Sequence, residues 1–309
     1  GILTMENWPI MRFIGKAGVP YLVQFSNAFP GWQRYNQSGE FLKRLQDVGR
    51  RFSEINITKS MLSRIPPHFL GIPAPAFIVH GGRRCDGYSR FVNGSTQKIY
   101  AHAMDYDEYR RVKSGGLGLA NTAVFLDEFL PFHPDITMMG LKAPMDAETY
   151  FLALRGLFDR IEKDLALNVV VAACPHSDYD KRPGVFGNRR VEKYRTAELV
   201  SESRFVIAHR STAINYAVLF RKPLILTATR STYSHSSQTP YFDGLSRALQ
   251  KAVQFFDDPN DVDLSNPYEV DNAIYDQYIR DYIKVPNSPD MPYWEIVANV
   301  INGSGITKI

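Results

Sequence analysis

Four short polar segments in the second half of the chain carry residue types that suit phosphate and sugar chemistry. They read Cys174-Pro175-His176-Ser177, Tyr194-Arg195-Thr196, His209-Arg210-Ser211-Thr212 and Thr227-Ala228-Thr229-Arg230. Arginine, histidine and hydroxyl side chains donate hydrogen bonds to anionic and hydroxylated ligands. Each segment follows an apolar run. If those runs are parallel strands, their carboxyl ends bring the segments to one crevice, where open α/β sheets bind their ligands.

Within the third segment, Ser211 and Thr212 have the position of a phosphate-binding turn. They lie between a strand-like run at 205–208 and a helical pattern at 213–220. A helix N-terminus offers free backbone N–H groups and a partial positive charge. A simpler interpretation stays open, in which Thr196, Ser211 and Thr212 only cap their helices. The presence of all four segments favours a phosphate-bearing ligand.

Apolar runs that alternate with helical patterns predict the elements that must position these segments. Strands are expected at 21–25, 76–79, 98–101, 122–126, 169–173, 190–194, 205–208 and 224–227. Helices are expected at 41–52, 151–165, from 196 onward and at 213–220. The run at 169–173 is continuously apolar, as in a strand buried on both faces of a parallel sheet. This order of elements is typical of an α/β fold.

The length and one glycine-rich segment predict the division into domains. A chain of 309 residues suggests two domains. Ser114-Gly115-Gly116-Leu117-Gly118 is the most linker-like segment of the sequence. We therefore expect one domain at 1–115 and a second at 120–309.

Composition excludes several classes of protein. Hydrophobic residues make up 44% and charged residues 22%, which rules out disordered, collagen-like and coiled-coil chains. A net charge of +4 is too small to indicate nucleic-acid binding. Cys85 and Cys174 are too few for a disulfide framework or a four-cysteine zinc site. The sequence shows no Gly-rich dinucleotide or P-loop fingerprint, no Gly-x-Ser-x-Gly elbow and no run of roughly 20 apolar residues. A cytoplasmic protein is expected.

The stretch from Ala123 to Thr227 resembles a known family in its order of motifs. The matching segments are Phe125-Leu126-Asp127-Glu128, Pro131 to Asp135, Val169 to Tyr179, Thr196 to Leu199, and Ala208 to Asn215. They are similar to the donor-binding domain of GT-B glycosyltransferases of bacterial surface-polysaccharide and lipopolysaccharide assembly. The resemblance implies two Rossmann-like domains facing a cleft, with a C-terminal helix that crosses back to the first domain. About 115 residues beginning at Gly1 are short for such a first domain, so we expect it to be reduced or truncated.

The resemblance also implies a nucleotide-sugar donor in the second domain. Its binding residues would be Pro175, His176, Ser177, Tyr194, Thr196, His209, Ser211, Thr212 and Arg230. His209 would in addition assist the leaving phosphate, although core packing is an alternative role for a histidine at a strand end. Relatives that use cytidine nucleotides carry a His-Pro pair where this chain has Cys174-Pro175, with a histidine only at His176. This partial match favours a cytidine nucleotide slightly.

An inverting transfer would require a general base close to the acceptor hydroxyl. Asp86, Asp105 and Asp107 are the candidates in the first half of the chain. Simpler roles stay open for two of them, because Asp86-Gly87 is a common turn dipeptide and Asp105 can cap the helix that follows it. The expected acceptor is a glycan or a lipid-linked glycan.

Three other functions remain alternatives at this point. Asp105-Tyr106-Asp107 could be the metal-binding Asp-x-Asp of a GT-A transferase. A sugar-nucleotide epimerase would share the expected fold, and a non-catalytic relative would keep the fold without tight nucleotide binding. The favoured prediction is a metal-independent glycosyltransferase with no cofactor and no nucleic-acid partner. It would be cytoplasmic, with at most peripheral contact at the inner face of the membrane.

Overall fold

The computed structural model describes residues 8–31, 67–85, 92–115, 120–133, 145–235 and 238–303. The chain forms two compact units, each assembled from separate stretches of sequence. Unit 1 comprises residues 1–28, 33–103 and 281–309, and unit 2 comprises 29–32 and 104–280. Both units are α/β and contain a parallel sheet, so the chain has two Rossmann-like units, as predicted.

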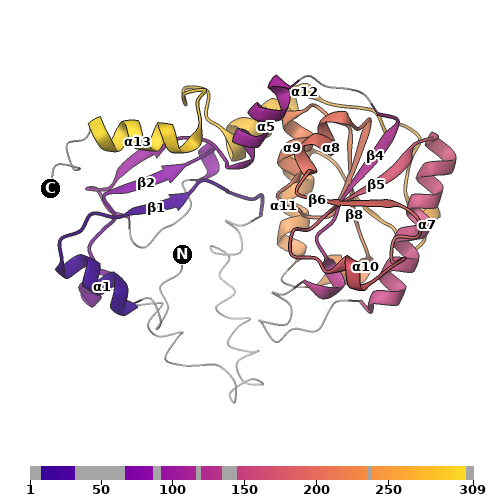
Figure 1. Cartoon of the computed structure of the whole chain (residues 1–309), viewed down its shortest axis with the longest axis horizontal. Coiled ribbons are helices and arrows are strands. Elements are labelled where there is room, and N and C mark those ends of the chain that lie inside the picture. The colour runs from indigo at the N-terminus through magenta and orange to yellow at the C-terminus, as the bar shows by residue number, and fades with distance from the viewer. Residues whose placement is uncertain are drawn as a thin grey trace, which may run out of the picture. The chain divides into compact units, whose positions relative to one another are not determined.

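Unit 1 contains a three-stranded parallel sheet in the order β1-β2-β3. The strands are β1 (Leu22–Phe25), β2 (Phe77–His80) and β3 (Gln97–Tyr100). The central strand β2 is buried along its whole length, whereas β3 buries only Ile99. Helix α1 (Trp8–Lys16) precedes the sheet in sequence, and helix α13 (Tyr293–Gly303) lies along the sheet (Figure 1). Tyr293, Ile296 and Val297 form the buried side of α13.

Unit 2 contains a six-stranded parallel sheet in the order β6-β5-β4-β7-β8-β9. Its strands are β4 (Thr122–Leu126), β5 (Asn168–Ala173), β6 (Arg190–Lys193), β7 (Phe205–Ala208), β8 (Leu224–Ala228) and β9 (Val253–Phe255). Its helices are α5 (Asp105–Ser114), α7 (Ala147–Leu165), α8 (Thr196–Glu202), α9 (Ile214–Leu219), α10 (Arg230–Ser234), α11 (Thr239–Leu249) and α12 (Asn272–Tyr278). The chain builds β4, β5 and β6 outward in one direction and then returns to place β7 on the other side of β4. This is the doubly wound order of a Rossmann unit.

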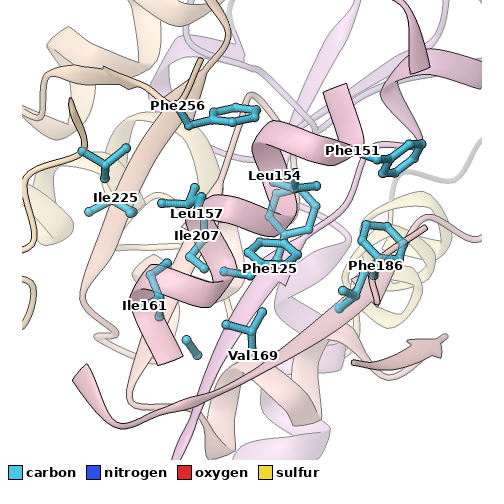
Figure 2. Packing of buried hydrophobic residues seen from close by; sticks show 14 of the residues in the cluster. Phe125, Phe151, Leu154, Leu157, Ile161, Val169, Phe186, Ile207, Ile225 and Phe256 are labelled. Atoms are coloured by element: carbon cyan, nitrogen blue, oxygen red, sulfur yellow. The ribbon is translucent and has the colours of Figure 1, made fainter. Parts of the chain in front are cut away.

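Alternate residues of the central strands face opposite layers of helices. Ala123 and Phe125 of β4, with Ile207 of β7, face α7 and belong to one large apolar cluster. Figure 2 shows Phe151, Leu154, Leu157 and Ile161 of α7 packed over this face. These α7 residues have the helical spacing seen in the sequence, and the Asp146 side chain caps the helix by accepting the Thr149 N–H at 2.9 Å.

Helices α8 and α9 contact each other, and α8 contacts β4 and β5. Helix α5 packs against both α8 and α9. In Figure 1, α8 and α9 lie on the side of the unit 2 sheet opposite to α7. Both faces of the sheet are therefore covered, which explains why β4, β7 and β8 read as continuous apolar runs.

The boundary between the units lies between Ala103 and Met104, before α5, and not in the glycine-rich segment after it. Helix α5 belongs to unit 2 because it packs on α8 and α9 and because Asp105 accepts a hydrogen bond from Asn215 at 2.8 Å. The C-terminal residues 281–303 belong to unit 1, where the Ala103 N–H donates to the Ile283 carbonyl at 2.7 Å. The helix expected at 41–52 lies outside the described residues.

Candidate functional site

A cavity of about 570 Å³ opens at the carboxyl ends of the central strands of unit 2. Its walls are the residues that follow β4, β5, β6 and β7, together with the first turn of α5. Strand order reverses between β4 and β7, where the two neighbouring connections leave in opposite directions. Open α/β sheets bind ligands at such a switch point, because the diverging connections leave a crevice there.

Six of the residues predicted from the sequence line this cavity. They are Asp105, Pro175, Tyr194, Thr196, Ser211 and Thr212. The structure therefore brings together the segments after β5, β6 and β7, which are far apart in the sequence. Ser211 also organises its own turn, because its hydroxyl accepts the Ala213 N–H at 3.2 Å.

Other predicted residues lie away from the cavity lining. His176 is exposed, and Ser177 is buried with its carbonyl bound by the Lys193 ammonium. Arg230 follows β8, stacks over the Phe255 ring and pairs with Asp261 at 3.6 Å. Asp86 lies outside the described residues.

Asp107 lies on α5, 3.9 Å from Arg110, and is not part of the lining. Residues two apart on a helix point in different directions. Asp105 and Asp107 consequently do not converge on one point, as the metal-binding Asp-x-Asp alternative would require. Within the described parts of the chain, no group of three or more His, Cys, Asp or Glu side chains is arranged to hold a metal ion.

His209 is fully buried on the α7 side of the sheet and does not line the cavity. Its ring stacks on Phe256, with the centroids 5.3 Å apart and the planes 7° apart. Nδ1 lies 2.8 Å from the Thr227 carbonyl, which can only accept, so Nδ1 carries the hydrogen and Nε2 accepts from the Tyr150 hydroxyl at 2.9 Å. Burial lowers the pKa of His209 to about 4, which keeps the ring neutral. This geometry gives His209 a packing role and no access to a ligand phosphate in the cavity.

Asp127 lines the cavity and ties the ends of two strands together. Its carboxylate accepts the Phe129 N–H at 3.0 Å, the Tyr179 hydroxyl at 2.9 Å and the Cys174 N–H at 3.1 Å. The side chain is 6% exposed, and burial raises the pKa of Asp127 to about 6 against the lowering effect of its three donors. These bonds set the position of the turn after β4 relative to the turn after β5.

Glu128 and Arg210 form a partly buried ion pair in the wall of the cavity. Glu128 accepts the Arg210 backbone N–H at 2.6 Å, and the two side chains are 3.8 Å apart. The Arg210 guanidinium also lies over the Tyr241 ring, 5.6 Å from its centroid. Burial raises the pKa of Glu128, and the charge of Arg210 partly offsets the increase. Arg210 thus holds a positive charge beside the cavity at the point where β7 ends.

On the side of the cavity formed by α5, Asp105 is the most constrained acidic residue. Its carboxylate is held by the amide of Asn215 and by Tyr216. Burial raises the pKa of Asp105 despite these hydrogen bonds. Glu108, one turn along α5, also lines the cavity and binds Arg111. The cavity therefore combines carboxylates, which accept bonds from hydroxyl groups, with one arginine suited to an anion.

Several lining residues were not among the predicted site residues. They are Glu108, Asp127, Glu128, His133, Cys174, Arg210 and Tyr216. A signal for some of them was present, since Asp127, Glu128 and Arg210 directly follow strand-like runs, as the predicted residues do. Glu108 lies in the first turn of α5 and Tyr216 lies within α9, and only the packing of α5 on α9 brings them to the cavity.

No protein-family model matches the sequence, and no curated protein shows significant similarity to it. Among solved structures, the chain is similar to MurG of Acinetobacter baumannii at 10% identity, with 98% of this chain and 72% of that chain covered and a TM-score of 0.43. The spinosyn rhamnosyltransferase SpnG, complexed with thymidine diphosphate, is 13% identical over 94% of this chain and 70% of its own, with a TM-score of 0.45. MnaA of S. aureus, in a structure with UDP, is 12% identical, with 99% of this chain and 80% of that chain covered and a TM-score of 0.46. Similarities this distant assign no function to the chain.

No helix in the described parts of the chain has the length and apolar character needed to span a membrane.

Proposed function

We propose that unit 2 binds a nucleotide-sugar donor in the cavity at the ends of β4–β7, and that the chain is a glycosyltransferase of the GT-B type. The observation that carries this proposal is the position of the cavity at the switch point of a doubly wound sheet, lined by polar turns from three strands and by Arg210. The acceptor class suggested by the sequence resemblance is a bacterial surface glycan or its lipid-linked precursor.

In this proposal, Arg210 and the Ser211-Thr212 turn hold the donor diphosphate. Negative charge develops on the diphosphate as the glycosidic bond breaks, and a fixed guanidinium stabilises that charge without a metal ion. Glu108 and Glu128 accept hydrogen bonds from ribose or sugar hydroxyls.

Asp105 is the proposed general base. Its carboxylate lines the cavity and is oriented by Asn215 and Tyr216. The pKa of Asp105 is raised by burial, which makes it a better proton acceptor than an exposed aspartate. The acceptor hydroxyl would transfer its proton to Asp105 as the hydroxyl oxygen attacks the anomeric carbon and the nucleoside diphosphate leaves.

Calorimetric titration of the whole chain with CMP, CDP, UDP and GDP tests the donor site. We expect at least one of these nucleotides to bind the wild type, and Arg210→Ala to weaken that binding about tenfold or more, as for loss of a charge-assisted hydrogen bond. Arg210→Lys should recover part of the affinity. Arg247→Ala, which removes an exposed arginine of α11 outside the cavity, is the matched control and should bind as the wild type does.

Failure of all four nucleotides to bind the wild type would overturn the proposal. Product analysis then separates the possible reactions of a binding-competent chain. Transfer that requires an acceptor and survives EDTA supports a metal-independent glycosyltransferase. Conversion of the sugar nucleotide in the absence of any acceptor would instead show an epimerase, and a strict Mn²⁺ requirement would exclude the metal-independent mechanism.

A further inference from the structure

Arg210 is the only arginine or lysine that lines the cavity among the described residues, so the position of its side chain decides where the cavity can hold an anion. Glu128 fixes the Arg210 backbone N–H, but the Arg210 Nε is 3.8 Å from the Glu128 carboxylate, which is too long for a hydrogen bond. This Nε is buried and has no hydrogen-bond partner in the described parts of the chain. The guanidinium therefore depends on another contact to keep its place in the cavity wall.

Tyr241 provides that contact from the first turn of α11. The Arg210 guanidinium carbon lies over the Tyr241 ring, 5.6 Å from its centroid, which is within the range of a cation–π interaction. A planar guanidinium can rest on an aromatic face, whereas a point charge such as an ammonium cannot stack in this way. Tyr241 itself does not line the cavity, so it reaches a ligand only through Arg210.

A short segment from the first part of the chain lies beside Tyr241. Residues 29–32 belong to unit 2, although the residues on both sides of them in the sequence belong to unit 1. Phe29 contacts the Tyr241 ring, with the centroids 5.9 Å apart and the planes inclined by 57°. The next residue, Pro30, is buried. We call residues 29–31 the strap, and its aromatic side chain packs against the ring that carries Arg210.

Two glycines allow the strap to lie directly on α11. Gly31 has a φ angle of +92°, and a Cβ at this position would overlap the Pro240 carbonyl. A Cβ at Gly244, one turn after Tyr241, would overlap the backbone of Pro30 and Gly31. Glycine is unfavourable inside a helix, so its use at Gly244 is explained by this close approach and not by the helix itself. The chain is therefore built to keep the strap next to Tyr241.

We propose that Tyr241 is a positioning residue for Arg210 and that the strap fixes the Tyr241 ring, so that the cavity carries a positive charge placed before any ligand binds. A cation that is already ordered binds an anion more tightly, because its side chain loses no further freedom on binding. The consequence for nucleotide affinity rests on the proposed function. The positioning of the guanidinium does not, and it can be measured without a ligand.

Relaxation of the Arg210 Nε–H group, measured by ¹⁵N NMR on the whole chain without ligand, tests the positioning. The resonance is assigned by its loss in Arg210→Lys. We expect an order parameter above about 0.8 in the wild type and in Tyr241→Phe, which keeps the ring, and one below about 0.6 in Tyr241→Leu. Gly244→Ala, which displaces the strap, and Phe29→Ala, which removes its ring, should lower the order parameter as well. Tyr268→Leu changes an exposed tyrosine of unit 2 outside the cavity and is the matched control.

Nucleotide titration in two backgrounds shows whether Tyr241 acts through Arg210. With the nucleoside diphosphate that binds the wild type best, Tyr241→Leu and Phe29→Ala should each lower the affinity about fivefold. In an Arg210→Ala background the same changes should alter the affinity less than twofold, because the group that they position is absent. A merely structural role of Tyr241 would lower the affinity equally in both backgrounds.

The outcomes distinguish this inference from the proposed function. An unchanged order parameter of Arg210 Nε–H in Tyr241→Leu refutes the positioning, whether or not nucleotide binds, and so do equal affinity losses in both backgrounds. A change in Tyr241→Leu that neither Phe29→Ala nor Gly244→Ala reproduces refutes the part assigned to the strap. If the wild type binds no nucleotide while the order parameters follow the expected pattern, the proposed function falls and the positioning of Arg210 stands.

Discussion

Asp127 shows how one largely buried side chain in the cavity lining can organise the candidate site. Each of its carboxylate oxygens is used, with two donors on one oxygen and the Cys174 N–H on the other. A neutral amide could not satisfy the same set, since its nitrogen would face another donor. The hydrogen bonds that hold the turns after β4 and β5 therefore depend on the protonation state of the Asp127 carboxylate.

This coupling predicts a specific pH dependence of stability. The pKa of Asp127 is about 6 in the folded chain, above the value of about 4 expected after unfolding. Between these pH values the folded state binds more protons than the unfolded state, so stability falls as pH rises through this window. Two pH units correspond to about 3 kcal/mol.

Asp127→Asn tests the effect, because the variant lacks this titration. The free energy of unfolding of the wild type minus that of Asp127→Asn should fall by about 2 kcal/mol between pH 4 and pH 7, because at pH 4 the unfolded group is already about half ionised; urea denaturation measures it. Asp178→Asn is the control, since the pKa of Asp178 is lowered by its hydrogen bond with Arg182 and its pH dependence has the opposite sign. A difference for Asp127→Asn that stays constant over this range would contradict the prediction.

Neighbouring residues at the end of β7 show what could be predicted about the site and what could not. The rule that ligands bind where parallel strands end indicates the segment 209–212, and Arg210, Ser211 and Thr212 line the cavity. The rule does not decide which of His209 and Arg210 faces the cavity. The alternation of side chains along β7 decides this question. His209 lies on the same face as Phe205 and Ile207, and α7 covers that face. The side on which Arg210 lies could therefore be predicted from the alternation along β7. The position of Asp105 at the cavity could not, because it depends on the packing of α5 against α8 and α9.

At the scale of elements, a polar network connects α7 to the edge of the unit 2 sheet. Arg189 is 10% exposed and binds Glu162 through Nε at 3.0 Å and through a second nitrogen at 2.6 Å. Glu162 also accepts the Val169 N–H of β5 at 3.1 Å. β6 pairs with β5 only from Val170 onward, so Glu162 satisfies a backbone donor just before that pairing begins.

Removing this carboxylate should therefore cost more than removing an ordinary surface acid. Glu162→Ala leaves the Val169 N–H and the Arg189 guanidinium with fewer partners, and we expect a loss of about 2 kcal/mol in the free energy of unfolding. Asp164→Ala, on the same helix, breaks only an exposed pair with Arg160 and should cost about 0.5 kcal/mol or less. Urea denaturation of both variants provides the comparison. Equal losses in the free energy of unfolding would show that the network contributes no stability beyond that of an exposed ion pair.

Elements with strong periodicity were predictable, and short ones were not. The apolar patterns predict a helix at 151–165, which is most of α7, and the strands β4, β5, β7 and β8. Strand β9 has three residues, all only partly buried, which is too short a stretch for alternation to appear. The first turn of α11 shows a Thr-Pro start, but its buried face depends on contacts with α12 and α10 that no local pattern reveals.

At the scale of the whole molecule, unit 1 depends on residues that are distant in sequence. His102 Nε2 lies 3.1 Å from the Met291 carbonyl, and the Ser288 hydroxyl donates to the Ala101 carbonyl. Gly81 and Gly82 approach the backbone of 281–283 so closely that an added Cβ would lie within 3.0 Å of it. Residues 281–303 thus complete the core of unit 1.

A chain ending at Arg280 should consequently lose the structure of unit 1 and keep that of unit 2. It lacks Ile283, Tyr293, Ile296 and Val297, and each such buried side chain contributes about 2 kcal/mol. Hydrogen exchange should show amides of β2 unprotected and amides of β4 and β7 protected as in the full chain. Protection of β2 in the shortened chain would contradict this assignment.

The discontinuous composition of unit 1 also has a consequence for biosynthesis. A ribosome releases the chain from the N-terminus, so β1, β2 and β3 emerge long before the segment 281–303 that completes their core. Every stretch of unit 2 has been synthesised by Arg280. Unit 2 can therefore fold before unit 1 is complete. Until the segment 281–303 joins unit 1, the apolar strands of that unit lack part of their core and are available to chaperones.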